Sequence, residues 1–225
     1  MNTSPLFGKK ISFNGDSICA ARGGYGKIIA ERCGMEYQNV AISGGTIAAE
    51  QYEGERPRHW ISRTICKMDE DSDFAIVEGG VNDAALLGDV GAPLLGKLSS
   101  GYNAELDDTT FFGAFESMLK QLIIRFKGKK IGYIAVHKMT QRFSSVYKGE
   151  DNFYLAAKTC CAKWGVPFLD LNSLLPAFGF FTPDGDPELY KLREIYTNRG
   201  DGWHPSDEGY KKYYCDKIEA WLLTL

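Results

Sequence analysis

Short apolar runs alternate along the chain with longer segments of helical periodicity, in which apolar positions recur three and four residues apart. The apolar runs predict strands at 10–14, 37–42, 74–77, 130–136 and 166–171. The segments between and after them predict helices at 26–33, 57–68, 109–126, 151–164 and 207–223. This alternation favours an α/β protein in which one parallel sheet, of about five strands, has helices on both faces.

Local signals mark several helix ends. Gly34 and Gly165 end two of the helices, and Ser206 caps the last one. Asp108 or Thr109 is expected to cap the long helix that ends near residue 126.

Two stretches, 87–107 and 172–200, are rich in glycine, proline or serine and do not fit the alternation. Loops of this length in a compact domain are often functional. We expect them to form lids over the carboxyl ends of the strands, with variable surface decoration as the alternative.

Four short polar motifs follow expected strands or precede the last helix. Gly15-Asp16-Ser17 follows the first strand, Ser43-Gly44-Gly45-Thr46 the second, and Gly79-Gly80-Val81-Asn82-Asp83 the third. Asp201-Gly202-Trp203-His204-Pro205 precedes the last helix. Ligands of parallel sheets bind beyond the carboxyl ends of the strands. We therefore expect these motifs to meet at one edge of the sheet.

The residue types in these motifs fit an acyl-transfer enzyme. Ser17 is a candidate nucleophile, His204 a candidate base, and Asp201 the group that orients the imidazole. Each motif also has a simpler interpretation. The first suits an ordinary helix cap, and the last suits a polar pair on a surface turn.

Two of these motifs could stabilise an oxyanion. The small residues of Ser43-Gly44-Gly45-Thr46 let a backbone N–H approach a ligand closely, and the carboxamide of Asn82 is a neutral donor. A glycine-rich phosphate site is the alternative for the first, although the chain has no complete phosphate-loop or dinucleotide fingerprint. For the other motif, Asn82 or Asp83 could instead cap a helix.

Two other histidines compete with His204 for the role of base. His59 stands between Arg58 and Trp60 on an expected helix, where a solvated position is the simpler interpretation. His137 follows the fourth strand, so it could line the site and contact the substrate.

Together, the four motifs resemble those of the SGNH (GDSL-type) hydrolase family. The resemblance runs over essentially the whole chain, from Gly15-Asp16-Ser17 to Asp201 and His204, with the motifs in the family's order. Ile18 stands where the name-giving motif has leucine, which is a mild departure. The resemblance implies a flavodoxin-like, three-layer α/β/α fold and hydrolysis of esters or related acyl groups.

The resemblance also implies roles for individual residues. Ser17 would be the nucleophile, His204 the base and Asp201 the third member of the triad. Ser17, Gly44 and Asn82 would form the oxyanion hole. No metal ion or organic cofactor is expected.

Composition narrows the partners and the compartment. The chain has 225 residues, is 44% hydrophobic and 24% charged, and carries a net charge of −3. We expect a single domain over 1–225, with neither nucleic acid nor a membrane as partner.

The six cysteines form no C-x-x-C, and no secretion signal is visible. A cytoplasmic protein with reduced thiols is therefore expected. The oligomeric state does not follow from the sequence.

The substrate is less defined. Aromatic residues near the motifs, such as Tyr25 and Trp203, suit the faces of sugar rings, so we expect a small-molecule or carbohydrate ester with a short acyl or acetyl group. A lipase or thioesterase for longer chains is an alternative, because Phe178, Phe180 and Phe181 could form an apolar surface. A non-catalytic flavodoxin-like binding module is the other alternative, although it would not need the acid–histidine pair.

Overall fold

The computed structural model describes residues 4–48, 61–85, 94–137, 150–175 and 187–225. Its centre is an all-parallel sheet of five strands in the order β2-β1-β3-β4-β5. The strands are β1 (Lys10–Asn14), β2 (Glu36–Asn39), β3 (Phe74–Glu78), β4 (Lys130–Ala135) and β5 (Phe168–Asp170). This strand order is the flavodoxin-like one, so the expected fold class is confirmed.

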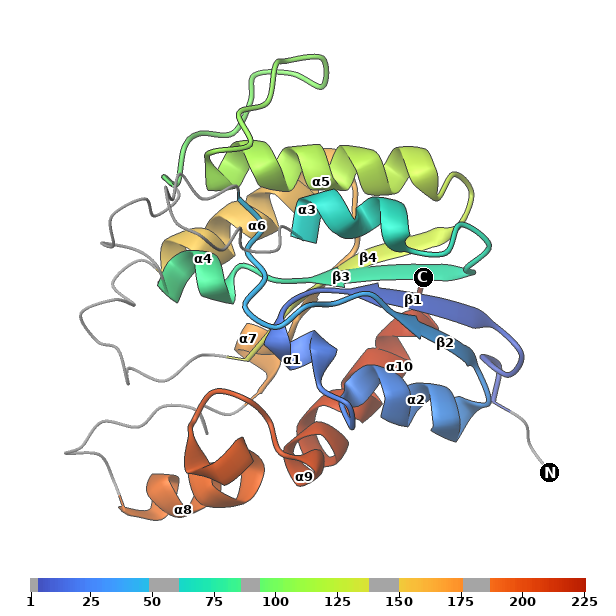
Figure 1. The fold of residues 1–225 in the computed structure, drawn as a ribbon, viewed down its shortest axis with the longest axis vertical. Helices are drawn as coiled ribbons and strands as arrows, with labels where there is room; N and C mark the ends of the chain where they lie inside the picture. Colours follow the sequence, from blue (N-terminus) through green and yellow to red (C-terminus); the bar gives the residue numbers. More distant parts are fainter. Residues whose placement is uncertain (1–3, 49–60, 86–93, 138–149, 176–186) are drawn as a thin grey trace.

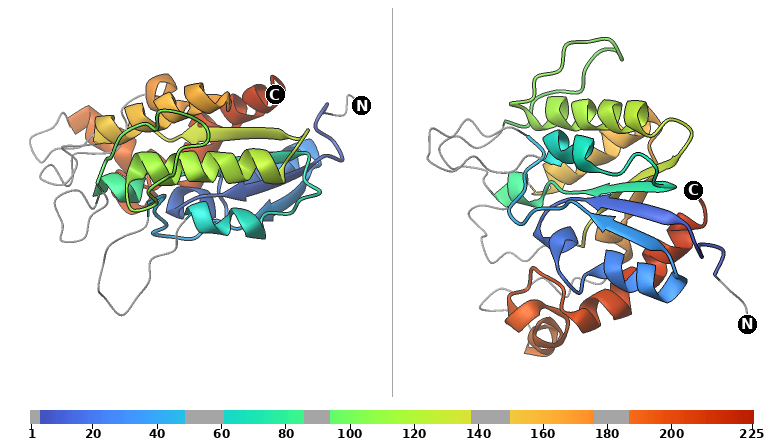
Figure 2. Two further views of the ribbon diagram at one scale, coloured as in Figure 1. Left: turned by 90° about the horizontal axis from the view of Figure 1, so that it is seen from above. Right: turned by 45° about the vertical axis from the view of Figure 1, so that its right-hand side comes forward.

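Helices cover both faces of the sheet (Figures 1 and 2). One face carries α3 (Ile61–Thr64) with its 3-10 extension Ile65–Lys67, α5 (Phe111–Arg125) and α6 (Glu150–Trp164). The other face carries α2 (Tyr25–Cys33), α9 (Asp207–Gly209), the π-helix Tyr210–Cys215 and α10 (Asp216–Leu222). Among the described residues, no helix is both long enough and apolar enough to span a membrane.

Short helices follow several strands or precede the last helical segment. They are α1 (Ser17–Ala20), α4 (Val81–Ala85), α7 (Leu171–Leu174), α8 (Pro187–Tyr196) and the 3-10 turn Asn198–Gly200. The periodicity of the sequence did not indicate α1, α4 and α7, because a helix of four or five residues shows little more than one turn of any pattern.

The register of the central strands positions the site. Asn14, the last residue of β1, pairs with Val77, so β3 extends one residue beyond the end of β1. From β1 the sheet continues to β2 on one side, and from β3 it continues to β4 on the other. The connections after β1 and β3 therefore diverge, and ligands of open α/β sheets bind beyond the carboxyl ends of the strands at such a point.

The long helix α5 begins later than expected. Its N-cap is Thr110, whose Oγ1 accepts a hydrogen bond from the Gly113 N–H at 3.2 Å. Neither Asp108 nor Thr109 caps it. Thr109 is held outside the helix because its own N–H and hydroxyl donate to Asp107 Oδ1, at 3.0 and 2.6 Å.

The stretch 172–200 is not one loop, contrary to expectation. Its described part contains most of α7, all of α8 and the 3-10 turn Asn198–Gly200. Residues 176–186, with the three phenylalanines considered above, lie outside the described residues. The helical content of α8 escaped the sequence analysis because the glycines and prolines just before it dominate the pattern.

The described part of the other stretch, 94–107, does not lie over the strand ends. It projects beyond the outer side of α5 (Figure 1). The N–H and hydroxyl of Ser99 donate to the carboxylate of Glu116 at 2.8 and 3.0 Å, and Lys163 forms an ion pair with the same carboxylate. Glu116 is fully buried, and a buried carboxylate requires donors. The hydrogen bonds from Ser99 and the ion pair with Lys163 therefore hold the loop against α5 and α6.

Candidate active site

Ser17 is the first residue of α1, directly after β1. Asp16 caps this helix, and its Oδ1 accepts a hydrogen bond from the Ile18 N–H at 2.9 Å. The φ of Gly15 is not positive, so its backbone conformation does not by itself require a glycine. A glycine is needed there for another reason: a Cβ would lie 2.5 Å from Glu78 Oε2. The serine turn is therefore packed closely on the end of β3.

The structure brings the serine, the histidine and the aspartate together. Ser17 Oγ lies 2.9 Å from His204 Nε2, although the two residues are 187 positions apart in the sequence. His204 Nδ1 lies 2.7 Å from Asp201 Oδ2. The other oxygen of Asp201 accepts the backbone N–H groups of Trp203 and His204 at 2.7 and 2.9 Å. The carboxylate is thus held in place while it orients the imidazole.

The charges at this site favour a basic imidazole. The hydrogen bond from Asp201 raises the pKa of His204 above 6.5, although burial opposes the rise. Burial alone would raise the pKa of Asp201, but hydrogen bonds from His204 and from the Trp203 N–H hold it below 3.8. The Trp203 ring also stacks on the imidazole, with 5.9 Å between centroids and 16° between planes.

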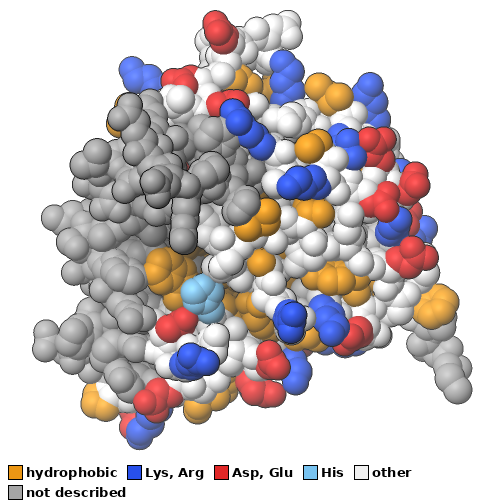
Figure 3. Space-filling view, in the orientation of Figure 1, with side chains coloured by type: hydrophobic (Ala, Val, Ile, Leu, Met, Phe, Trp, Pro, Cys, Tyr) orange, Lys and Arg blue, Asp and Glu red, His pale blue; other side chains and the backbone are white. Residues whose placement is uncertain are grey.

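His204 is open to solvent. Its side chain is 37% exposed, whereas His137, the other described histidine, is buried. A histidine side chain reaches the surface in Figure 3, beside acidic and hydrophobic side chains. A substrate can therefore approach the serine and the imidazole from outside.

The three segments that carry the expected oxyanion donors are hydrogen-bonded to one another. Beyond β2, the Ile42 N–H donates to Gly15 O at 3.0 Å, which ties the second turn to the first. Asn82 Nδ2 donates to Gly45 O at 2.9 Å, which ties the third turn to the second. Gly44 lies between these bonds with φ +77°, and a Cβ there would meet no atom within 4 Å. The turn is thus open at Gly44.

The donors retain capacity for a ligand. Among the described residues, no acceptor forms a hydrogen bond with the backbone N–H of Ser17 or of Gly44. The carboxamide of Asn82 has a second hydrogen beyond the one donated to Gly45.

Asp83 supports this arrangement, a role that the sequence analysis missed. Its carboxylate is fully buried and accepts the N–H of Ile47 at 2.9 and 3.1 Å and the N–H of Ala48 at 2.9 Å. Burial raises its pKa to about 7, against these hydrogen bonds. The carboxylate clamps the loop after β2 onto α4. The position of Asp83 next to Asn82 in the same motif was the one sequence signal that could have indicated this supporting role.

Two tyrosines of the π-helix also reach the site, and neither was identified from the sequence. The Tyr210 hydroxyl donates to Ile18 O at 2.8 Å and so braces α1. The Tyr214 hydroxyl contacts Nδ1 of His137. In the sequence, both tyrosines belong to the buried stripe of an amphipathic helix, which hides any polar role.

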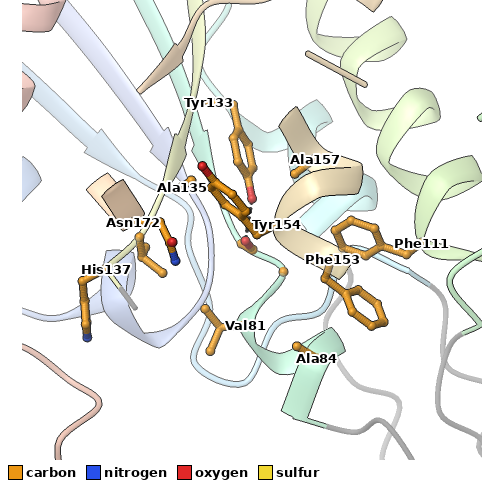
Figure 4. Close-up of a pocket in the computed structure, with 13 residues that line it drawn as sticks. Val81, Ala84, Phe111, Tyr133, Ala135, His137, Phe153, Tyr154, Ala157 and Asn172 are labelled. Atoms are coloured by element: carbon orange, nitrogen blue, oxygen red, sulfur yellow. Dashed lines mark hydrogen bonds between the residues drawn. The ribbon is translucent and has the colours of Figure 1, made fainter. Parts of the chain in front are cut away.

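His137 lies at the end of β4 and is 1% exposed. Burial lowers its pKa to about 4, so the ring is neutral at neutral pH. It borders an apolar cavity of about 40 Å³, on the side opposite Phe111 and Phe153 (Figure 4). Direct contact between His137 and a substrate stays a prediction.

Other candidates do not join the site. Tyr25 was considered for binding sugars, but its side chain is fully buried in the core. His59 lies outside the described residues. Within the described ranges, no group of three His, Cys, Asp or Glu side chains could hold a metal ion.

Comparison with known families decides the identity. A model of the GDSL-like lipase/acylhydrolase family matches residues 13–212. The chain belongs to this family. It is therefore a serine ester hydrolase rather than a non-catalytic binding module, and the resemblance noted in the sequence is confirmed. A catalytic triad and an oxyanion hole are typical of the family.

Solved structures show the same fold as this family member. A protein from Lactobacillus plantarum has a TM-score of 0.73 at 24% identity, over 97% of this chain and 98% of that one. The lipase/acylhydrolase from Enterococcus faecalis has a TM-score of 0.61 at 16% identity, over 95% of both chains. A carbohydrate acetylesterase family member from Sinorhizobium meliloti has a TM-score of 0.60 at 14% identity, over 96% and 98%. Comparison with curated proteins gave no match.

The hydrogen bond to Asp201 raises the pKa of His204, so Asp201→Asn should lower this pKa. The imidazole must be neutral to act as a base. The acid limb of kcat/KM should therefore lie above pH 6.5 in the wild type and move to lower pH in the variant. NMR titration of the imidazole C–H signals measures the pKa directly, and His137 should stay neutral down to about pH 4.

Glu208→Gln is the matched control, because it removes an exposed carboxylate close in sequence to His204. It should leave the titration of His204 unchanged. An Asp201→Asn variant whose His204 titrates as in the wild type would contradict the assignment.

Proposed function

We propose that Ser17 is the nucleophile of this ester hydrolase, with His204 as its base and Asp201 as the partner of the imidazole. The 2.9 Å contact between Ser17 Oγ and His204 Nε2 carries this proposal. His204 takes the hydroxyl proton as Oγ attacks the ester carbonyl, and Asp201 stabilises the imidazolium. The imidazolium then protonates the leaving alcohol. Water, activated by the same imidazole, hydrolyses the acyl-enzyme.

The oxyanion of the tetrahedral intermediate would accept hydrogen bonds from the N–H groups of Ser17 and Gly44 and from Asn82 Nδ2. The free capacity of these donors supports this role. Preorganised donors stabilise developing charge because they need no reorientation during the reaction.

The substrate we propose is an ester of a short acyl group, acetyl above all. The apolar cavity beside Asn82 supports this length, because Gly80 and Val81 line it and Asn82 follows them directly. Its volume of about 40 Å³ is far below the roughly 150 Å³ of a cavity that binds benzene. An acetyl group can fill a cavity of this size, whereas the longer chain of a lipase or thioesterase substrate would extend beyond it.

For the alcohol part we propose a carbohydrate. The Trp203 ring lies beside His204 and is partly exposed, and its face could pack against a sugar ring. A solved structure with the same fold is that of a carbohydrate acetylesterase family member. We also propose a cytoplasmic location, because the six cysteines are free thiols.

Ser17→Ala should abolish hydrolysis of p-nitrophenyl acetate, because no other atom takes the place of Oγ. It should also abolish labelling by a fluorophosphonate probe. Ser100→Ala, which changes an exposed serine, should retain both. Wild-type turnover by Ser17→Ala would show that the nucleophile lies elsewhere.

Asn82→Ala should lower kcat about a hundred- to a thousand-fold, as is typical for the loss of one oxyanion donor. KM should change little, because this interaction strengthens only in the transition state. Asn103→Ala makes the same change on an exposed loop and serves as the control. An effect on KM alone would instead indicate a contact with the bound substrate.

Ala157→Gly should enlarge the cavity by one methyl group, since Ala157 lines it from α6. One methylene more or less in an apolar pocket is worth about 1–3 kcal/mol, so the ratio of propionate to acetate kcat/KM should rise about tenfold. Ala156→Gly makes the same change at the neighbouring buried position, which does not line the cavity, and should leave the ratio unchanged. Equal ratios in the two variants would contradict this cavity as the acyl site.

A further inference from the structure

A second carboxyl group lies directly beneath the turn that carries the proposed nucleophile. Glu78 is the last residue of β3, after four apolar residues, and it is fully buried. The pairing of Asn14 with Val77 places Glu78 next to the turn after β1. Its Oε2 accepts the Asp16 N–H at 3.2 Å, and only a glycine at position 15 leaves room for this approach.

The carboxyl groups of Glu78 and Asp16 are adjacent, and both are fully buried. Asp16 Oδ1 accepts the Ile18 N–H at 2.9 Å. Asp16 Oδ2 and Glu78 Oε1, however, are buried without a hydrogen-bond partner in the described part of the chain. Two adjacent carboxylates cannot both stay ionised in a buried site. One proton held by the pair removes one charge and supplies a hydrogen bond between the two carboxyl groups.

The surroundings indicate which group keeps the proton. Burial raises the pKa of Asp16 to about 6, and hydrogen bonds from Ile18 and Glu78 limit the rise. Burial and the neighbouring Asp16 charge raise the pKa of Glu78 well above 4.5. Glu78 is therefore the acid and Asp16 the carboxylate.

The other ionisable groups around the pair come from every element packed against it. They are Cys19 of α1, Tyr25 of α2, Asp83 of α4, Tyr133 of β4, Tyr210 and Tyr214 of the π-helix, and His204. Burial raises the pKa of the thiol and the four phenols, so they are neutral at neutral pH. Within this set only His204 can become positive, so no permanent cation offsets a second negative charge.

We propose that Glu78 is a positioning residue that stays protonated through neutral pH and donates its proton in a hydrogen bond to Asp16. The bond holds the Asp16 carboxylate as the cap of α1, and this cap aims the hydroxyl and N–H of Ser17. The single charge on Asp16 also favours the His204 imidazolium that forms during the reaction. When the shared proton is lost at alkaline pH, the two buried carboxylates repel each other, and this repulsion displaces the Asp16 carboxylate from its capping position. The kinetic part of this proposal rests on Ser17 as the nucleophile.

Two substitutions separate positioning from simple structural support. In Glu78→Gln the amide N–H₂ replaces the acid O–H as donor at every pH. We expect kcat within about threefold of wild type and no alkaline decline. In Glu78→Ala the donor is lost, and kcat should fall about tenfold or more with KM within about twofold.

The control is Glu116→Gln, which changes another fully buried glutamate, in the Lys163 ion pair on α5. It should lower the melting temperature and leave the pH profile of kcat as in the wild type. A Glu78→Gln variant with the wild-type alkaline decline, or a Glu78→Ala variant with the wild-type kcat, would overturn the positioning role.

Infrared difference spectroscopy gives a readout that is independent of catalysis. At neutral pH the wild type minus Glu78→Gln spectrum should show the C=O stretch of a protonated, buried carboxylic acid, while the band of Asp83, whose pKa is about 7, cancels because both proteins contain it. The band should persist in Ser17→Ala. If Ser17→Ala stayed active and still showed the band, the assignment of Ser17 as nucleophile would be wrong, but the proton on Glu78 would stand. If the wild type lacked the band, the shared proton would be refuted.

Discussion

The hydrogen bond between the Ser17 hydroxyl and the His204 imidazole is the contact on which the site depends, and it joins segments 187 residues apart. Buried aromatic packing holds these segments together. Tyr25 of α2 stacks on Tyr214 of the π-helix at 5.7 Å between centroids and packs edge-on against Phe13 of β1 at 5.4 Å. The last helical segment is thereby fixed against the strand that delivers the serine.

Surface charges contribute less to this junction. Arg32 of α2 pairs with Asp216 of α10 at 2.7 Å, and both side chains are exposed. An exposed ion pair stabilises a protein by about 0–1 kcal/mol, whereas burial of one large apolar side chain stabilises it by about 1.5–3 kcal/mol. The buried aromatic packing therefore contributes more to the junction between the two ends of the chain than this ion pair does.

Buried carboxyl groups organise the turns at the carboxyl ends of β1 and β3. Asp16, Glu78 and Asp83 are fully buried, and each accepts at least one backbone N–H. Burial of an acid costs free energy even when hydrogen bonds offset part of the cost. Such groups are therefore poor stabilisers of a fold but effective at holding turns in one geometry, and perturbed acids of this kind concentrate at functional sites.

The order of apolar and polar positions determined much of this protein by itself. Strand β1 lies at Lys10–Asn14 as expected, and Ser206 caps the last helical segment, because burial periodicity and capping act within a few residues of sequence. The same local motifs selected Ser17, Asp201 and His204. Only the tertiary structure decided their distances, the approach of Glu78 to the serine turn, and the contact of Tyr214 with His137. These depend on strand register and helix packing between distant segments, which no local pattern encodes.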